Sequence, residues 1–174
     1  MGHLNIEIKA RCKNQDCIHS VLKAHHAEFK GLDHQIDTYF ETKSGRLKLR
    51  EGNIENALVY YEREDKEGPK KSDIVLYQTG QSSGSLKDIL TKTLGIKVVV
   101  EKRREIYFID NVKFHLDLVE DLGTFVEIEA IDVTGVIGKE KLHEQCREFC
   151  TLFNIAKEDY ISCSYSDLLL QKKP

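Results

Sequence analysis

The chain has 174 residues, of which 40% are hydrophobic and 32% charged, and its 26 basic and 29 acidic residues leave a formal net charge of −3. This length suits one domain over residues 1–174 with a sizeable core. The near balance of charge argues against a nucleic-acid-binding surface. No apolar run approaches the ~18 residues that span a bilayer, and no signal peptide precedes the first strand pattern. The five cysteines form no CxxC pair, so we expect reduced thiols in a cytoplasmic protein with no membrane or nucleic-acid partner.

The N-terminal segment predicts a strand over about residues 3–12. Its side chains alternate without a break between an apolar face (Ile6, Ile8 and Ala10) and a polar face (Asn5, Glu7, Lys9 and Arg11). This period of two is typical of a half-buried strand. Asn14 or Asp16 then caps a predicted helix that runs to about Glu28 and ends at Gly31.

The middle of the chain predicts four further strands, over residues 34–40, 46–51, 57–63 and 74–78. The connections between the first three are short, which makes those strands antiparallel neighbours. Between the last two, residues 65–72 crowd lysine, glycine and proline together. This composition predicts a mobile, solvated loop.

The second half of the chain predicts a short helix over 85–94, then a three-stranded meander over 98–109, 112–119 and 124–131. An amphipathic helix follows over 138–153, with Leu142, Cys146, Phe149 and Cys150 on its inward face, and residues 164–169 form a short helix or strand. A sheet of about eight strands tends to close on itself. The predicted fold class is therefore α+β: an eight-stranded antiparallel β-barrel with flanking helices.

The charged faces of these strands predict an unusual interior. We expect the apolar faces to pack outward against helices and flanking segments, with these representative pairs: Ile6 and Ile8, Leu47 and Leu49, Leu116 and Leu118. The charged faces then line the bore, where unpaired charge is costly unless a ligand is bound. Carboxylates that face ammonium and guanidinium groups across a wet cavity suit a metal ion and a polyphosphate. The alternative is a charged interior held together by salt bridges alone.

The ordered set Asn5-x-Glu7-x-Lys9, Leu47-Lys48-Leu49-Arg50, Lys102-x-Arg104, Asp117 and Glu127-x-Glu129 resembles the CYTH family, the triphosphate tunnel metalloenzymes. Members of that family include class IV adenylate cyclases, thiamine triphosphatases and inorganic triphosphatases. The sequence segments 35–40, 102–107 and 122–129 look most like those of the bacterial class IV cyclase branch. The resemblance implies a tunnel with acidic metal ligands and a basic lining that grips a triphosphate.

The resemblance also implies a role for each matching residue. It implies Mg²⁺ or Mn²⁺ held by Glu7, Asp117, Glu127 and Glu129, and phosphate contacts from Lys9, Lys48, Arg50, Arg63, Lys102 and Arg104. The catalytic group would be Glu7, Lys9, Glu127 and Glu129. These residue types suit the chemistry independently, because Mg²⁺ prefers oxygen ligands and arginine matches phosphate geometry.

Three parts of the chain carry open questions. The pattern of 57–63 does not decide whether Glu62 or Arg63 faces inward, and the outward facing of Glu101, Arg103 and Glu105 is implied by the resemblance only. Asn5 stands where the family usually has a glutamate, so metal affinity falls or one of two metals is lost.

Three functions follow from the resemblance. The first is a metal-dependent cyclase that converts ATP, a nucleoside triphosphate, to cyclic AMP and pyrophosphate. The second is a hydrolase of inorganic, thiamine or nucleoside triphosphate. The third is a polyphosphate-binding or nucleotide-binding module with weakened catalysis, motivated by Asn5. Each is compatible with a monomer or a homodimer.

Overall fold

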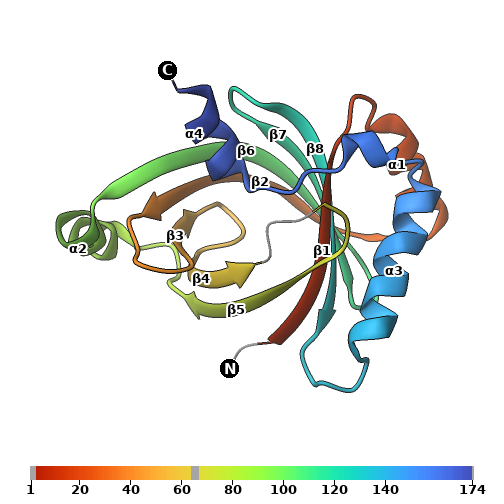
Figure 1. The fold of residues 1–174 in the computed structure, drawn as a ribbon, viewed down its shortest axis with the longest axis horizontal. Coiled ribbons are helices and arrows are strands. Elements are labelled where there is room, and N and C mark those ends of the chain that lie inside the picture. The colour runs from red at the N-terminus through yellow and green to blue at the C-terminus, as the bar shows by residue number, and fades with distance from the viewer. Residues whose placement is uncertain (1–2, 64–66, 174) are drawn as a thin grey trace.

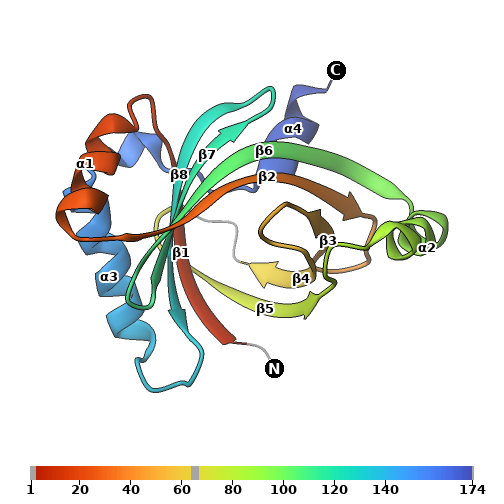
Figure 2. The same cartoon turned by 180° about the vertical axis from the view of Figure 1, so that it is seen from behind.

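The computed structural model describes residues 3–63 and 67–173. Eight antiparallel strands close into a barrel in the order β1-β5-β4-β3-β2-β6-β7-β8 (Figures 1 and 2). Their bounds are β1 (His3–Arg11), β2 (Glu28–Phe40), β3 (Arg46–Glu51), β4 (Ala57–Arg63), β5 (Lys70–Gln78), β6 (Ile96–Ile109), β7 (Val112–Val119) and β8 (Gly123–Asp132). The helices are α1 (Asp16–Ala24), α2 (Gly84–Leu94), α3 (Lys139–Leu152) and α4 (Tyr165–Lys172). The predicted fold class is confirmed.

The main hydrophobic core lies outside the barrel, between its wall and two helices. Helices α1 and α3 lie together against β1, β7 and β8 (Figure 1). This core contains Ile6 and Ile8 from β1, Phe114 from β7, and the predicted inward residues of α3, such as Leu142. The expectation that apolar strand faces pack outward is confirmed here. It fails at Leu118 on β7, which faces outward but is 51% exposed.

A second apolar cluster lies inside the barrel, at the end where α4 docks. Tyr39, Val59 and Phe125 belong to it, together with Tyr165 at the start of α4. A capping box at Ser164 and Asp167 fixes the first turn of α4. Only part of the bore is therefore charged. Within the described residues, every helix is too short or too polar to traverse a bilayer.

The predicted boundary between the first helix and the second strand is wrong. Helix α1 ends at Ala24, and β2 begins at Glu28, before the predicted start at residue 34. Gly31 does not end a helix. It lies within β2 at a register shift, with φ +133°, and a Cβ there would approach Ile54 Cδ1 to 2.8 Å. A glycine needed for a bulge resembles a helix terminator in sequence, because both positions favour positive φ.

The predicted loop over 65–72 is wrong at its C-terminal end. Strand β5 begins at Lys70, before the predicted start at Ile74, and pairs with both β1 and β4. The Lys70 side chain is fully buried, and its ammonium donates to the carbonyl oxygen of Ser162 at 2.8 Å. The charge of Lys70 is thus satisfied by the backbone. Residues 64–66 of this region lie outside the described residues.

Candidate functional site

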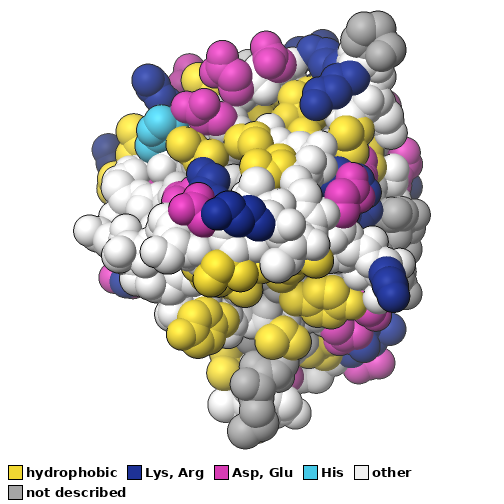
Figure 3. Space-filling model, turned by 90° about the vertical axis from the view of Figure 1, so that its left-hand side faces the viewer, with side chains coloured by type: hydrophobic (Ala, Val, Ile, Leu, Met, Phe, Trp, Pro, Cys, Tyr) yellow, Lys and Arg dark blue, Asp and Glu magenta, His cyan; other side chains and the backbone are white. Residues whose placement is uncertain are grey.

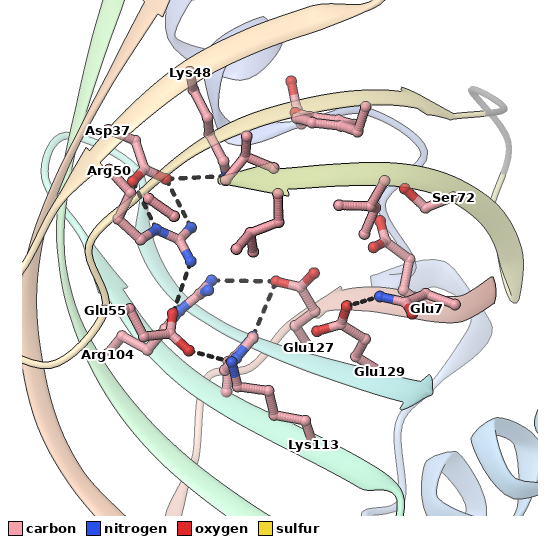
Figure 4. Close-up of a pocket in the computed structure, with 18 of the residues that line it drawn as sticks. Glu7, Asp37, Lys48, Arg50, Glu55, Ser72, Arg104, Lys113, Glu127 and Glu129 are labelled. Carbon is pink, nitrogen blue, oxygen red and sulfur yellow. Dashed lines mark hydrogen bonds and ion pairs between the residues drawn. The ribbon is translucent and has the colours of Figure 1, made fainter. Parts of the chain in front are cut away.

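The barrel encloses a cavity of about 300 Å³. Every strand contributes side chains to its wall, and the β3–β4 turn and the start of α4 complete it. Among the described lining residues, six lysines and arginines face five acidic residues (Figure 4). The two kinds are unevenly placed: Glu7, Glu127 and Glu129 lie on β1 and β8, whereas most cations lie on β3, β6 and β7. Such segregation gives one cavity an acidic wall and a basic wall.

The acidic wall follows from the register of β1 and β8. Glu7 lies directly opposite Glu129, and Lys9 lies opposite Glu127. Like charges in a cross-strand pair are destabilising. Burial raises the pKa of Glu129 to about 7, and the neighbouring carboxylates of Glu7 and Glu127 add to that rise while Lys113 opposes it. The side-chain nitrogen of Asn5 donates to Glu129 Oε1, while the buried Oδ1 of Asn5 has no hydrogen-bond partner among the described residues.

The basic wall is organised around Asp37, whose side chain is 1% exposed. Arg50 donates to both carboxylate oxygens at 2.8 and 2.9 Å, and the ammonium groups of Lys48 and Lys102 lie 3.1 and 2.8 Å away. Burial lowers the pKa of Lys102 to about 7; Asp37 opposes this shift, and the nearby cations Arg50, Arg104 and Lys48 reinforce it. Three cations are therefore held close together by one carboxylate.

A second buried pair joins the two walls. Arg104 donates to both oxygens of Asp117 at 2.7 and 2.6 Å, and it also reaches Glu127 Oε2 at 3.2 Å. The hydroxyl of Tyr165 donates to Asp117 at 2.7 Å. Burial works to raise the pKa of Glu127, but Lys9, the imidazole of His115, whose Nδ1 lies 3.5 Å away, and the charge of Arg104 hold it well below the ordinary value. Glu127 is thus ionised.

The structure brings most of the predicted site residues together. The cavity is lined by Glu7, Lys9, Lys48, Arg50, Lys102, Arg104, Glu127 and Glu129. Asp117 is fully buried behind Arg104 and does not line the cavity, so its part in metal binding stays a prediction. The side chain of Arg63 lies outside the described residues. Glu101 and Arg103 are exposed, and Glu105 lies half-buried beside His19 and Tyr107 on the outer surface, as the resemblance implied.

Several residues that line the cavity were not predicted from the sequence. Lys113 and His115 line the cavity, and their alternation with Asp117 along β7 was a usable signal. Asp37 also lines the cavity, and its place two residues before Tyr39, on the same face of β2, was a comparable signal. Glu55 lies in a turn, where no periodicity indicates the direction of a side chain.

The donor chemistry of the acidic wall fits a divalent cation. Among the residues that the structure describes, no three His, Cys, Asp or Glu side chains form a ready-made ligand group. The carboxylates of Glu7, Glu127 and Glu129 and the unsatisfied amide oxygen of Asn5 are nevertheless all hard oxygen donors, as Mg²⁺ and Mn²⁺ prefer. A bound cation would also offset the repulsion between Glu7 and Glu129, which lie directly opposite each other.

Comparisons with known proteins agree with this geometry. A family model described as the CYTH domain matches residues 3–165. A protein of Methanocaldococcus jannaschii named "Putative adenylate cyclase MJ0240" is 27% identical over 176 residues, which cover 95% of this chain and 98% of that protein. The solved structure of the PH1012 protein from Pyrococcus horikoshii OT3 is 26% identical with a TM-score of 0.81, covering 94% of this chain and 98% of that one. A Hippeastrum protein named "Putative adenylyl cyclase HpAC1", described as revealing a dominant triphosphatase activity, shares the fold at 17% identity, with a TM-score of 0.64 and coverage of 98% of this chain and 97% of that one.

Proposed function

Because this chain belongs to the CYTH domain family, we propose that it is a metal-dependent enzyme that binds a triphosphate in the barrel and converts ATP to cyclic AMP and pyrophosphate. The observation that carries this proposal is the pair of opposed walls in one cavity, carboxylates on β1 and β8 facing lysines and arginines on β3 and β6. A core stabilised by salt bridges alone gives no reason to place Glu7 directly opposite Glu129.

The cations of the basic wall hold the phosphates. Arg50 and Arg104 present guanidinium forks, and the ammonium groups of Lys48 and Lys102 supply point charge between them. Transfer at phosphorus needs mainly positioning and neutralised charge, without a covalent nucleophile. A divalent ion held by Glu7, Glu127 and Glu129 would add Lewis-acid charge neutralisation.

A nucleotide suits the cavity better than inorganic triphosphate. Beyond the charged walls, the lining includes apolar side chains from β4, β5, β8 and the β3–β4 turn, namely Ile54, Ala57, Val59, Ile74, Leu76 and Ile131. Phosphate groups gain nothing from such a surface, whereas a nucleoside buries apolar area against it. The name of the Methanocaldococcus relative supports the same substrate.

A triphosphatase is the second candidate, in which water attacks the terminal phosphate within the same walls. The activity stated for the Hippeastrum protein favours it, although that protein shares only the fold with this chain. A binding module with weakened catalysis is the third candidate, because Asn5 contributes no negative charge to the acidic wall.

Product analysis separates the three functions. The purified protein is incubated with ATP, tripolyphosphate or thiamine triphosphate, with Mg²⁺ or Mn²⁺, and with Glu127→Gln and the outer-face variant Glu101→Gln as matched controls. We expect cyclic AMP and pyrophosphate from the wild type and from Glu101→Gln only. Inorganic phosphate as the product would replace the cyclase by the hydrolase. Tripolyphosphate binding without turnover would leave the binding module.

The metal requirement has a test that does not depend on turnover. Replacing Asn5 by glutamate adds a carboxylate beside Glu129, so Asn5→Glu should bind Mn²⁺ more tightly in calorimetry and melt at a lower temperature in EDTA. Unchanged metal affinity and unchanged melting would place the metal away from Asn5.

A homodimer and a cytoplasmic location stay predictions. Apolar side chains gather on the side of the molecule where α2 lies (Figure 3). Ile89 and Ile96, on α2 and at the start of β6, are 59% and 45% exposed there. This surface is where a second copy would pack. Sedimentation at the monomer mass at all concentrations would exclude the homodimer.

A further inference from the structure

Glu55 connects two cations across the bore. Its side chain extends from the β3–β4 turn into the cavity, and its Oε2 accepts from Arg50 Nη1 at 2.8 Å (Figure 4). Its Oε1 contacts the ammonium of Lys113. Arg50 lies on β3 and Lys113 on β7, and β2 and β6 separate these strands in the barrel. One carboxylate therefore holds two cations that belong to different parts of the wall.

The backbone of the turn is built to place this side chain. Asp33 is fully buried, and its carboxylate accepts the backbone N–H groups of Asn53, Ile54 and Glu55 at 2.8, 2.9 and 2.9 Å. Gly52 lies so close that a Cβ would approach Asp33 Oδ1 to 2.6 Å. These three backbone hydrogen bonds fasten the turn to β2 without the Glu55 side chain, whose Oε2 also accepts from the side-chain amide of Gln35 on β2 at 3.1 Å. The carboxylate can leave the two cations without unfolding the turn.

Glu55 differs from the other carboxylates that pair with the basic wall. The side chains of Asp37 and Asp117 are 1% and 0% exposed, whereas that of Glu55 is 25% exposed. Burial works to raise the pKa of Glu55, but Arg50 and Lys113 outweigh it and hold the pKa well below the ordinary value. An ionised carboxylate on a partly solvated side chain gives up its ion pairs at a lower cost than a buried one.

We propose that Glu55 is a resident counter-ion, which holds Arg50 and Lys113 until a phosphate group of the substrate takes its place. This inference rests on the proposed function, because it needs a polyphosphate in the cavity. The Glu55 carboxylate and a substrate phosphate are both anions with several oxygens, so they compete for the same donors on Arg50 and Lys113. The observed affinity is then the difference between the phosphate contacts and the Glu55 contacts. Glu55 therefore raises KM and selects against anions that cannot engage both cations at once.

The test is the charge-neutral isostere Glu55→Gln, with Glu101→Gln as a control of equal net charge on the outer face. Binding of tripolyphosphate is measured by calorimetry in EDTA at fixed salt. We expect about tenfold tighter binding for Glu55→Gln, a gain between those of exposed and of buried charge pairs, and less than a roughly twofold change for the control. Unchanged or weaker binding by Glu55→Gln would overturn the proposal. If the wild type binds no tripolyphosphate with or without Mg²⁺, the proposed function fails as well.

A second variant separates displacement from a general effect of charge. In a Lys113→Met background, Glu55 has one cation fewer to hold, so the same Glu55→Gln change should gain much less affinity. A gain of the same size in both backgrounds would mean that Glu55 repels the ligand at a distance, and the counter-ion proposal would be wrong. Circular dichroism checks that each variant is folded, which the backbone hydrogen bonds to Asp33 favour.

Discussion

Replacing Asp37 by asparagine removes the charge that holds the basic wall together and keeps the shape of the side chain. Asp37 is 1% exposed and contacts three cations. Removing one partner of a buried ion pair costs about 3–5 kcal/mol. We expect a cost at the lower end of this range for two reasons. Lys102, whose pKa is already lowered to about 7, can lose its proton. Arg50 keeps Glu55 as a partner. A loss of about 3 kcal/mol lowers the melting temperature by ~6–12 °C in a chain of this size.

The measurement is urea unfolding at pH 7 with thermal melting, compared with Asp73→Asn. Asp73 is 66% exposed and lies 3.0 Å from Lys71, so its loss should cost less than about 0.5 kcal/mol. The cost at Asp37 should persist in about 0.5 M NaCl, because buried pairs are weakly screened. A loss at Asp37 no larger than that at Asp73 would refute the reasoning that this carboxylate organises the cations.

Three further predictions follow from the same contacts. Arg50→Ala and Glu127→Ala should each abolish turnover while circular dichroism still reports a folded protein; activity retained with a large loss of melting temperature would favour an interior held by salt bridges alone. The native pKa of Glu129, about 7, lies above its unfolded value, so its contribution to stability is present at pH 5 and is lost as the pH rises through 7. In urea unfolding without divalent ions, the free energy of unfolding of Glu129→Gln minus that of the wild type should therefore increase by more than about 1 kcal/mol from pH 5 to pH 8. A difference that stays constant across that range would contradict the raised pKa. Gly52→Ala should lower the free energy of unfolding by about 1–3 kcal/mol, because its Cβ would lie 2.6 Å from a buried carboxylate oxygen. Gly84→Ala should cost little in the same experiment, because no described atom lies within 4 Å of its Cβ position. Equal costs would mean that the turn at Gly52 shifts to make room.

The period of two along each strand was enough to predict most of the cavity wall. Glu7 and Lys9 alternate with Ile6 and Ile8, and once one face is apolar the other must line the bore. The bounds of β3, β4 and β7 also match the prediction, because short turns mark them clearly. These features are local, so a single sequence is sufficient to predict them.

Other features depended on contacts between distant segments. Asp117 has the same facing as His115, yet Arg104 and Tyr165 close over it, and Tyr165 arrives from a helix 48 residues further along the chain. Glu55 lies in the cavity only because Asp33, 22 residues earlier, fastens the turn. No periodic pattern in the sequence indicates the contacts that bury Asp117 or those that place Glu55.

The sequence by itself therefore determined the inward face of most strands, since alternation along a strand is a property of the local backbone. The tertiary structure alone decided which of those side chains meet. Closing the barrel joins strands that are far apart in the chain and sets their register, and the register puts Glu7 against Glu129 and Arg50 against Asp37. Neighbouring charges, not the residue types alone, then determine the pKa of each group and the ligand that the cavity can accept.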